Sequence, residues 1–225
     1  MRHLVLATNN ANKVSEITEL LGMNGLTGLT IESIGSYTQH EPVEDGGSYL
    51  ANATIKAQAA AAITGLPCLA EDSGVEIAAL GGAPGVETAP WVAAQGGWIA
   101  AMLAVHEKVK ETGRAGMDFQ STFVLAFPDG TFIDATACCP GTFTYPPRGH
   151  EGFGHDPYFV PAEIKVEEFN YFIPYGGHCT YAEMGLAEKQ KISPRALAMG
   201  KLVEKIKKHD RAAEQQDHQR TQGHA

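Results

Sequence analysis

Apolar and polar positions recur with a helical period in most of the first half of the chain. An apolar run at residues 3–7 predicts a strand, and residues 14–21 carry apolar side chains at helical spacing. A second strand is expected over residues 29–34. The alanine-rich residues 49–64 then predict a helix that packs closely on a sheet and ends at Gly65. Strands that alternate with helices in this way are typical of an α/β fold.

The second half of the chain changes to strand periodicity with tight turns. Residues 121–127 and 131–138 predict two antiparallel strands joined by a Pro-Asp-Gly turn, and residues 141–145 predict a third. A final helix is expected from Ser193, its N-cap, to about Lys208. The two halves together predict a mixed β-sheet flanked by helices.

Size and composition limit the domain organisation and the class of function. The 225 residues suffice for one large domain, and we expect a single two-lobed domain over residues 1–210 and a polar, disordered tail over 211–225. A net charge of −9 argues against a general nucleic-acid binder. No apolar run is long enough to span a membrane, the start is not a signal peptide, and the four cysteines lack metal-ligand spacing. A cytoplasmic protein without nucleic-acid or membrane partners is expected.

Two adjacent carboxylates, Glu71 and Asp72, follow a short apolar run at residues 67–70 that predicts a buried strand. Ser73 and a glycine come next. Ligands of α/β proteins bind at strand ends, and neighbouring carboxylates are costly unless a cation neutralises them. Without a thiolate or histidine beside them, that cation is expected to be Mg²⁺. The alternative is a polar turn in which Asp72 or Ser73 caps a helix.

A polar loop at residues 8–13 joins the first predicted strand to the first predicted helix. Backbone amides at a helix start, with Lys13 beside them, form a natural phosphate site. The loop is not a P-loop, because its glycines are missing, and a tight turn capped by Asn is the alternative. Glu16 lies three residues after Lys13 and is expected to be able to pair with it.

Three further segments offer side chains to such a site. The acidic loop 41–47 can add a carboxylate, for which Glu44 is our choice, or can be merely a solvated loop. Lys56 lies on the alanine-rich helix and can reach phosphate or extend into solvent. In the glycine-rich loop 148–156, Phe153 and Asp156 can stack on and hydrogen-bond a heterocycle. The alternative there is a turn with a core phenylalanine.

Taken in order, these segments resemble the inosine/xanthosine triphosphate pyrophosphatase family, whose members hydrolyse non-standard purine nucleoside triphosphates. No single motif is decisive, but together they span nearly the whole chain. They are LATNNANK at residues 6–13, NA at 52–53 with KA at 56–57, EDSG at 71–74, LGGAPGV at 80–86, GFGHD at 152–156, YAE at 181–183, and EK at 188–189 with IS at 192–193 and Arg195.

The resemblance implies an elongated mixed sheet with two lobes around a central substrate cleft, usually in a homodimer. It implies Mg²⁺-dependent cleavage between the α- and β-phosphates of ITP, dITP or XTP, giving the monophosphate and pyrophosphate. Glu44 and Asp72 would hold Mg²⁺, and Asp72 would also orient or deprotonate the attacking water. Glu71 would support the metal site, and Lys13 and Lys56 would complete the catalytic set.

The resemblance also implies the residues that contact the substrate. Those at the triphosphate would be Thr8, Asn9, Asn10, Ala11, Asn12 and Lys13. Those at the sugar and base would be Ser73, Phe153, Gly154, His155, Asp156, Lys189 and Arg195, with Lys189 and Arg195 reaching toward the 6-oxo edge of the purine. A donor at that edge rejects a 6-amino base, because the donor would be left unpaired.

The sequence departs from the family pattern at three positions on the base side. Pro90 replaces an arginine, His155 replaces a tyrosine, and Pro194 replaces a histidine. The aromatic-rich connection 162–179 is also longer than usual and could cover the cleft or extend a dimer contact. We therefore expect retained hydrolysis with altered base selectivity. Two alternatives are the same chemistry on another or modified nucleotide, and a nucleotide-binding protein without turnover.

Overall fold

The computed structural model describes residues 2–162, 165–166, 171–172 and 177–222. Its main sheet has the strand order β2-β1-β3-β5-β6-β7, with β4 paired to β3. The strands are β1 (His3–Leu6), β2 (Thr30–Ser33), β3 (Cys68–Ile77), β4 (Pro84–Gly85), β5 (Gly116–Ala126), β6 (Phe132–Phe143) and β7 (Phe159–Pro161). β1 pairs in parallel with β2 and β3, whereas β3, β5, β6 and β7 are antiparallel neighbours. The predicted mixed sheet is confirmed.

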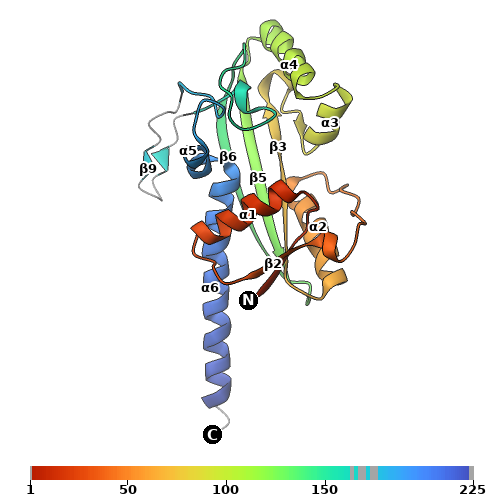
Figure 1. Ribbon diagram of the computed structural model, residues 1–225, viewed down its shortest axis with the longest axis vertical. Coiled ribbons are helices and arrows are strands. Elements are labelled where there is room, and N and C mark those ends of the chain that lie inside the picture. Colours follow the sequence, from red (N-terminus) through yellow and green to blue (C-terminus); the bar gives the residue numbers. More distant parts are fainter. Residues whose placement is uncertain (1, 163–164, 167–170, 173–176, 223–225) are drawn as a thin grey trace.

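Helices cover both faces of this sheet (Figure 1). They are α1 (Ala11–Met23), α2 (Tyr49–Thr64), α3 (Thr88–Ala94), α4 (Trp98–Thr112), α5 (Leu186–Ile192) and α6 (Pro194–Gln222), with the 3₁₀ turns η1 (Ile34–Ser36), η2 (Ala78–Leu80) and η3 (Asp156–Tyr158). A small separate ladder joins β8 (Lys165–Val166) to β9 (Tyr171–Phe172). No described helix is long and apolar enough to cross a membrane.

Alternating side chains on the long strands β3 and β5 feed two cores on opposite faces of the sheet. On one face, Leu69 and Phe123 pack with α1 and α6. On the other, Ala70 and Val124 pack with the small alanines of α2, which bring this helix close to the sheet. A third core lies at the far end of β3 and β5, under α3 and α4.

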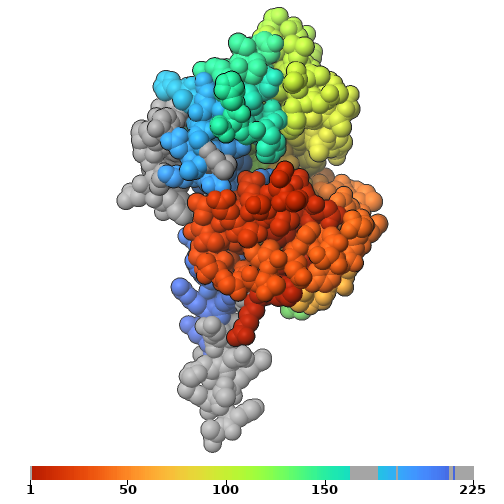
Figure 2. Space-filling view, viewed as in Figure 1, coloured from red at the N-terminus to blue at the C-terminus, as the bar shows by residue number. Residues whose placement is uncertain are grey.

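This arrangement produces two lobes along one elongated sheet. The N-terminal lobe holds β1, β2, α1 and α2, and the second lobe holds α3, α4 and the far ends of β5 and β6 (Figure 1). Figure 2 shows the red-to-orange N-terminal lobe meeting the green second lobe along a transverse seam. The long antiparallel strands cross that seam, so they fix the distance between the lobes.

Three predictions of element bounds are wrong. The strand expected over residues 141–145 is not a separate element, because β6 runs unbroken from Phe132 to Phe143. β3 does not stop at residue 70 but continues through the carboxylates to Ile77, because residues 68–77 pair with β5 along their whole length. α6 does not end near Lys208 but extends to Gln222, through residues expected to be disordered. Its last turns are rich in alanine, glutamine, glutamate and arginine, which favour a helix without burial. Much of the connection 162–179, including Phe169 and Tyr175, lies outside the described residues.

Candidate active site

The site lies at a gap in the sheet. β1 pairs with β3 as far as Leu69, and β4 pairs with β3 from Val75. Between these points, no described strand pairs with residues 70–74 on the β1 side. The open edge of β3 therefore presents its polar residues in mid-strand, between the two lobes, rather than at a strand end.

The two adjacent carboxylates of β3 point to opposite faces of the sheet. Glu71 faces α1 and α6, where its Oε1 accepts hydrogen bonds from Ser121 (2.9 Å) and Arg195 Nε (2.8 Å). Asp72 faces α2, where its Oδ1 accepts from Lys56 Nζ at 3.1 Å. Alternation along the strand is the reason, since successive side chains leave on opposite sides. The two acids therefore have different partners, so a single cation held between them, as their adjacency suggested, is not supported.

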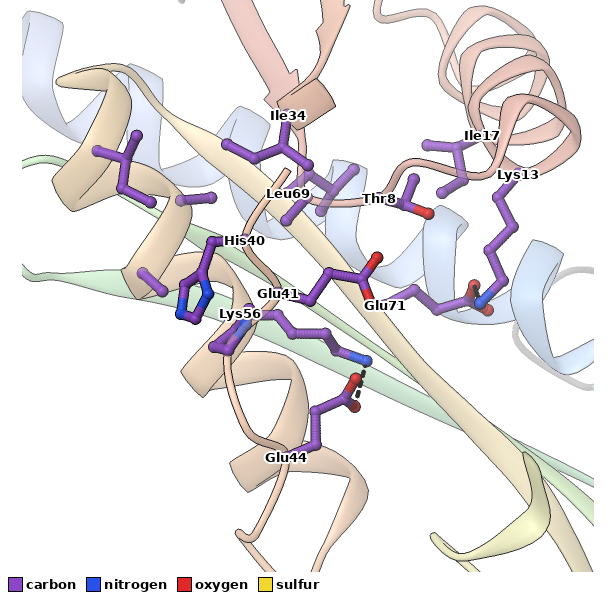
Figure 3. Close-up of a pocket in the computed structure, with 15 residues that line it drawn as sticks. Thr8, Lys13, Ile17, Ile34, His40, Glu41, Glu44, Lys56, Leu69 and Glu71 are labelled. Atoms are coloured by element: carbon purple, nitrogen blue, oxygen red, sulfur yellow. Dashed lines mark ion pairs between the residues drawn. The ribbon is translucent and has the colours of Figure 1, made fainter. Parts of the chain in front are cut away.

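A cavity of about 230 Å³, here called the lysine cavity, opens at the gap. Thr8, Lys13, Glu44, Lys56 and Glu71 line it together with side chains of η1, α1 and α2 (Figure 3). The lining comes from both faces of the sheet. Two ammonium groups and a hydroxyl therefore face one space, which is lined by the N-terminal lobe and the adjoining part of β3.

The residues of the predicted phosphate loop have different roles, because one caps α1 and others line the lysine cavity. Asn10 is the N-cap of α1, and its Oδ1 accepts from the amides of Asn12 (3.0 Å) and Lys13 (3.3 Å). Ala11 and Asn12 are exposed in the first turn of this helix. Asn9 donates to Glu41 Oε1 at 3.3 Å. Of this loop, Thr8 and Lys13 line the lysine cavity.

Lys56 contacts two carboxylates, Glu44 in the lining of the lysine cavity and Asp72, which is not among its lining residues. Its Nζ lies 2.7 Å from Glu44 Oε2 and 3.1 Å from Asp72 Oδ1, and the Glu44 contact is drawn in Figure 3. Asp72 Oδ2 is buried and has no hydrogen-bond partner within the described residues. Burial raises the pKa of Asp72, against the lowering effect of Lys56. A buried oxygen without a donor beside a second carboxylate is a suitable ligand for a hard cation.

Glu71 is ionised in this site. Burial by itself would raise its pKa, but Arg195 and Lys13 outweigh burial and lower the pKa to about 2. Lys13 Nζ lies 3.7 Å from Glu71 Oε2. Arg195 also contacts Glu16 Oε2 at 2.5 Å. The expected pair between Glu16 and Lys13 is therefore replaced by Glu16–Arg195 and Lys13–Glu71, because both cations turn toward the buried acid.

A second cavity of about 420 Å³, here called the aromatic cavity, adjoins the first. The two share Lys13 and Glu71 as lining residues, so they meet at this ion pair. The aromatic cavity is lined by rings and by a few polar groups, including Trp98, Phe119, Phe153, His155, Tyr181, Ser73, Lys189 and Arg195. Phe153 is 62% exposed, so its ring is accessible to a flat ligand.

Two residues expected at the substrate lie behind the wall of the aromatic cavity. Asp156 is fully buried, and its Oδ2 accepts from Lys189 Nζ (2.6 Å) and from the Phe153 amide (2.8 Å). Gly154 packs on Trp98, whose ring lies 2.8 Å from where a Cβ would stand. Both therefore shape the loop and hold Lys189 in place, and direct contact of Asp156 with a ligand is not supported.

His155 is packed among aromatic rings. Its ring centroid lies 3.9 Å from that of Phe119 and 5.1 Å from that of Trp98. Burial lowers the pKa of His155 well below its usual value, and Lys189 and Arg195 add to the effect. The imidazole is therefore neutral, and its buried Nδ1 has no partner within the described residues.

Sequence reasoning missed Trp98 and Ser121 as residues of the site, and it paired Glu16 with Lys13 rather than with Arg195. Ser121 was detectable as a polar residue inside an apolar strand, since a buried hydroxyl needs a partner. Glu16 and Trp98 lie on helices, where their spacing is equally typical of a solvent face or a core. Their neighbours come from distant parts of the chain.

The fold and the site together define a class of protein. It is an α/β protein with a cleft for an anionic ligand that carries a flat ring, because a cavity with lysines and carboxylates joins an aromatic cavity across a gap in the sheet. Within the described residues, no three histidine, cysteine or carboxylate side chains gather as a metal site. A cation held here would therefore need ligands from the bound molecule or from water.

Comparison with known proteins gives the family. The model of the Ham1 family matches residues 4–205, and the chain belongs to this family. The dITP/XTP pyrophosphatase of Corynebacterium glutamicum (strain R) is 38% identical over 208 residues, which cover 90% of this chain and 96% of the relative. The dITP/XTP pyrophosphatase of Rhodospirillum centenum is 40% identical over 167 residues, which cover 72% of this chain and 75% of the relative.

Solved structures agree with this assignment. A HAM1 protein from Coxiella burnetii superposes with a TM-score of 0.75 at 29% identity, covering 92% of this chain and all of that chain (100%). A nucleoside-triphosphatase / dITP/XTP pyrophosphatase from Mycobacterium abscessus superposes with a TM-score of 0.68 at 31% identity, covering 87% and 96% of the two chains. The family resemblance carried by the motifs is confirmed.

Proposed function

We propose that this protein is a nucleoside triphosphate pyrophosphatase that hydrolyses non-standard purine nucleotides. Its substrates are ITP, dITP and XTP, and its products are the nucleoside monophosphate and pyrophosphate. The observation that carries the proposal is the meeting of the two cavities at Lys13 and Glu71. A triphosphate fits the lysine cavity while its base lies in the aromatic cavity. The names and the coverage of the relatives support the same substrate class.

Glu44 and Asp72 are the residues that would hold Mg²⁺. The buried Asp72 Oδ2 without a partner and the nearby Glu44 carboxylate supply hard oxygen ligands. Magnesium is commonly held by one or two carboxylates, with substrate phosphates and water completing its octahedron. When bound, the ion neutralises phosphate charge and sharpens a water nucleophile.

The other residues of the lysine cavity bind and position the triphosphate. The N-terminus of α1 and the Lys13 ammonium attract phosphate oxygens, and Thr8 adds a hydroxyl. Lys56 holds the Asp72 carboxylate at Oδ1, which leaves Oδ2 for the reaction. Asp72 also orients or deprotonates the attacking water, the role that the family resemblance gives it.

The aromatic cavity selects the base. Phe153 offers a stacking surface, and Lys189, held by Asp156, offers hydrogen-bond donors to an oxo group. Arg195 lines the same cavity but is already held by Glu16 and Glu71. Pro194 supplies no donor at all, and His155 is packed against rings. We therefore propose that hydrolysis is retained and that the preference among bases differs from that of relatives.

A nucleotide panel tests both parts of the proposal. Pyrophosphate release from ITP, XTP, dITP, GTP and ATP is measured with Mg²⁺ and again with excess EDTA. Release that needs Mg²⁺ and is strongest with 6-oxo purines supports the reaction. A preference for ITP and XTP as steep as in relatives would overturn the altered selectivity alone. A modified pyrimidine triphosphate is added to the panel, and its fast turnover would favour the alternative substrate.

A nucleotide binder without turnover is the remaining alternative. It would bind ITP in wild type and in Asp72→Asn and release pyrophosphate in neither, whereas the proposed enzyme loses release only in the variant. We also propose a cytoplasmic homodimer, by resemblance to the family, and sedimentation velocity of the full chain would test the dimer.

A further inference from the structure

The loop that carries Glu44 has little structure of its own to hold that carboxylate in place. Residues 37–47 connect η1 to α2 without helix or strand, and most of them are exposed. The Glu44 side chain itself is 41% exposed. A ligand on such a loop is precise only if something outside the loop holds it, because loops without packed side chains are mobile.

A buried asparagine on α2 holds the downstream end of this loop. The Oδ1 of Asn52 accepts a hydrogen bond from the Gly46 amide at 2.9 Å, and Asn52 is only 4% exposed. The approach is so close that a Cβ on Gly46 would lie 2.5 Å from the Ala51 Cβ. The glycine two residues after Glu44 is therefore required for the loop to dock on α2.

The same helix face also carries the link to Asp72. Asn52 and Lys56 are one turn apart, and Lys56 joins Glu44 to Asp72. Burial raises the pKa of Asp72, and the Asn52 amide is among the groups that oppose this rise. Asp72 Oδ2 still accepts no hydrogen bond within the described residues. The amide therefore lies beside the carboxylate without occupying its free oxygen.

The two links respond differently to a charged ligand. Lys56 holds Glu44 by charge, so an arriving phosphate and metal ion redistribute that contact. Asn52 holds the loop through a neutral, partly buried hydrogen bond, which a change of charge leaves in place. We infer that Asn52 is a positioning residue, which keeps the Glu44 loop docked beside Asp72 so that both carboxylates are ready for one Mg²⁺. The inference rests on the proposed function for the roles of Glu44 and Asp72.

The upstream end of the loop is held more weakly. Glu41 accepts from Asn9 at 3.3 Å, and both residues are exposed. Exposed contacts of this kind contribute little, whereas a buried hydrogen bond left unmade is costly. Asn52 should therefore dominate. Glu41→Gln should therefore change hydrogen exchange of the loop by less than about two-fold. Asp45→Asn is the matched control, because it makes the same change of charge on this loop at a residue without a described contact, and it should have an equally small effect.

The test compares Asn52→Leu with Gln58→Met, an amide-to-aliphatic change on the exposed side of the same helix. Hydrogen exchange of residues 39–47 is measured without metal or nucleotide, and the Mg²⁺ concentration for half-maximal pyrophosphate release is measured with XTP. For Asn52→Leu we expect exchange and the half-maximal Mg²⁺ concentration each to rise about five-fold, the equivalent of one lost hydrogen bond. Turnover at saturating Mg²⁺ should stay within about two-fold, and Gln58→Met should resemble wild type.

Asn52→Asp supplies a second arm, since it keeps an acceptor for the Gly46 amide, and exchange of the loop should stay close to wild type. If Asn52→Leu does not fold, Asn52→Ser takes its place, because its side chain is too short to reach Gly46. Lower turnover at every Mg²⁺ concentration with unchanged loop exchange would overturn the inference. If wild type released no pyrophosphate from any nucleotide, the proposed function would fail, while the exchange data would still decide whether Asn52 holds the loop.

Discussion

The two ends of the cleft are built on different physical principles. In the lysine cavity, both lysines are paired with carboxylates, Lys13 with Glu71 and Lys56 with Glu44. In the aromatic cavity, rings pack on rings and the one imidazole is neutral. Replacing one member of a buried ion pair leaves its partner as an unpaired buried charge, whereas an aromatic ring can be exchanged for another of similar size. Two of the departures from the family pattern, His155 and Pro194, line the aromatic cavity.

The largest expected effect lies at Asp72, which Lys56 links to the lysine cavity. Asp72→Asn keeps the shape but removes the carboxylate that orients water, so turnover should fall about 1000-fold, the usual range for a lost general base. Pyrophosphate release at saturating Mg²⁺ measures it. Asp134→Asn, a change at a partly exposed side chain of β6 that lines neither cavity, should leave turnover unchanged. A fall in turnover of less than ten-fold in Asp72→Asn would show that another residue is the general base.

The next effect concerns the ion pairs that join the two ends. Arg195→Met leaves the Glu71 carboxylate buried without its closest cation, which should lower the free energy of unfolding by about 3–5 kcal/mol. Urea titration measures the loss. The double variant Arg195→Met with Glu71→Leu should recover most of it. Lys205→Met, which breaks an exposed pair of 3.9 Å with Asp134, should cost less than about 1 kcal/mol.

The pH dependence of stability should report the same carboxylate. The pKa of Glu71 falls from 4.5 in the unfolded chain to about 2 in the fold, so the unfolded state binds more protons between these values. The contribution of ionised Glu71 to the free energy of unfolding, up to about 3 kcal/mol, is complete above pH 5 and is lost as the pH falls toward 2. The difference in unfolding free energy between wild type and Glu71→Gln should therefore shrink from pH 7 to pH 3. A constant difference would contradict the low pKa.

The smallest effect is expected in the aromatic cavity. His155→Tyr should shift the ratio of kcat/KM for XTP over GTP by about ten-fold, because one altered contact at the base is worth roughly 1–2 kcal/mol. Turnover of the better substrate should change little, since the lysine cavity is untouched. His150→Tyr, at an exposed position in the same loop, serves as the control. A large fall in turnover with an unchanged ratio of kcat/KM for XTP over GTP would show that the aromatic cavity also affects the hydrolysis step.

Local sequence patterns were sufficient to predict most helices and strands. They did not show that Glu71 and Asp72 face opposite sides of the sheet. Helical spacing predicted α1 and α2, and Asn10 and Ser48 cap them as expected from side chains that accept backbone amides. The adjacent acids suggested one shared cation. Only the pairing of residues 68–77 with β5 makes that stretch a continuous strand, and alternation along it then separates Glu71 from Asp72.

The sequence by itself determined the order of strands and helices, the family, and the residue types needed for phosphate and Mg²⁺, since these depend on local spacing and on chemistry. The tertiary structure decided which charges meet. Glu71 and Arg195 are far apart in the chain, yet they pair across the gap in the sheet, and Asp156 lies behind the cavity instead of facing it. Spacing along a chain sets which face a side chain takes, whereas contact between distant elements depends on how those faces pack.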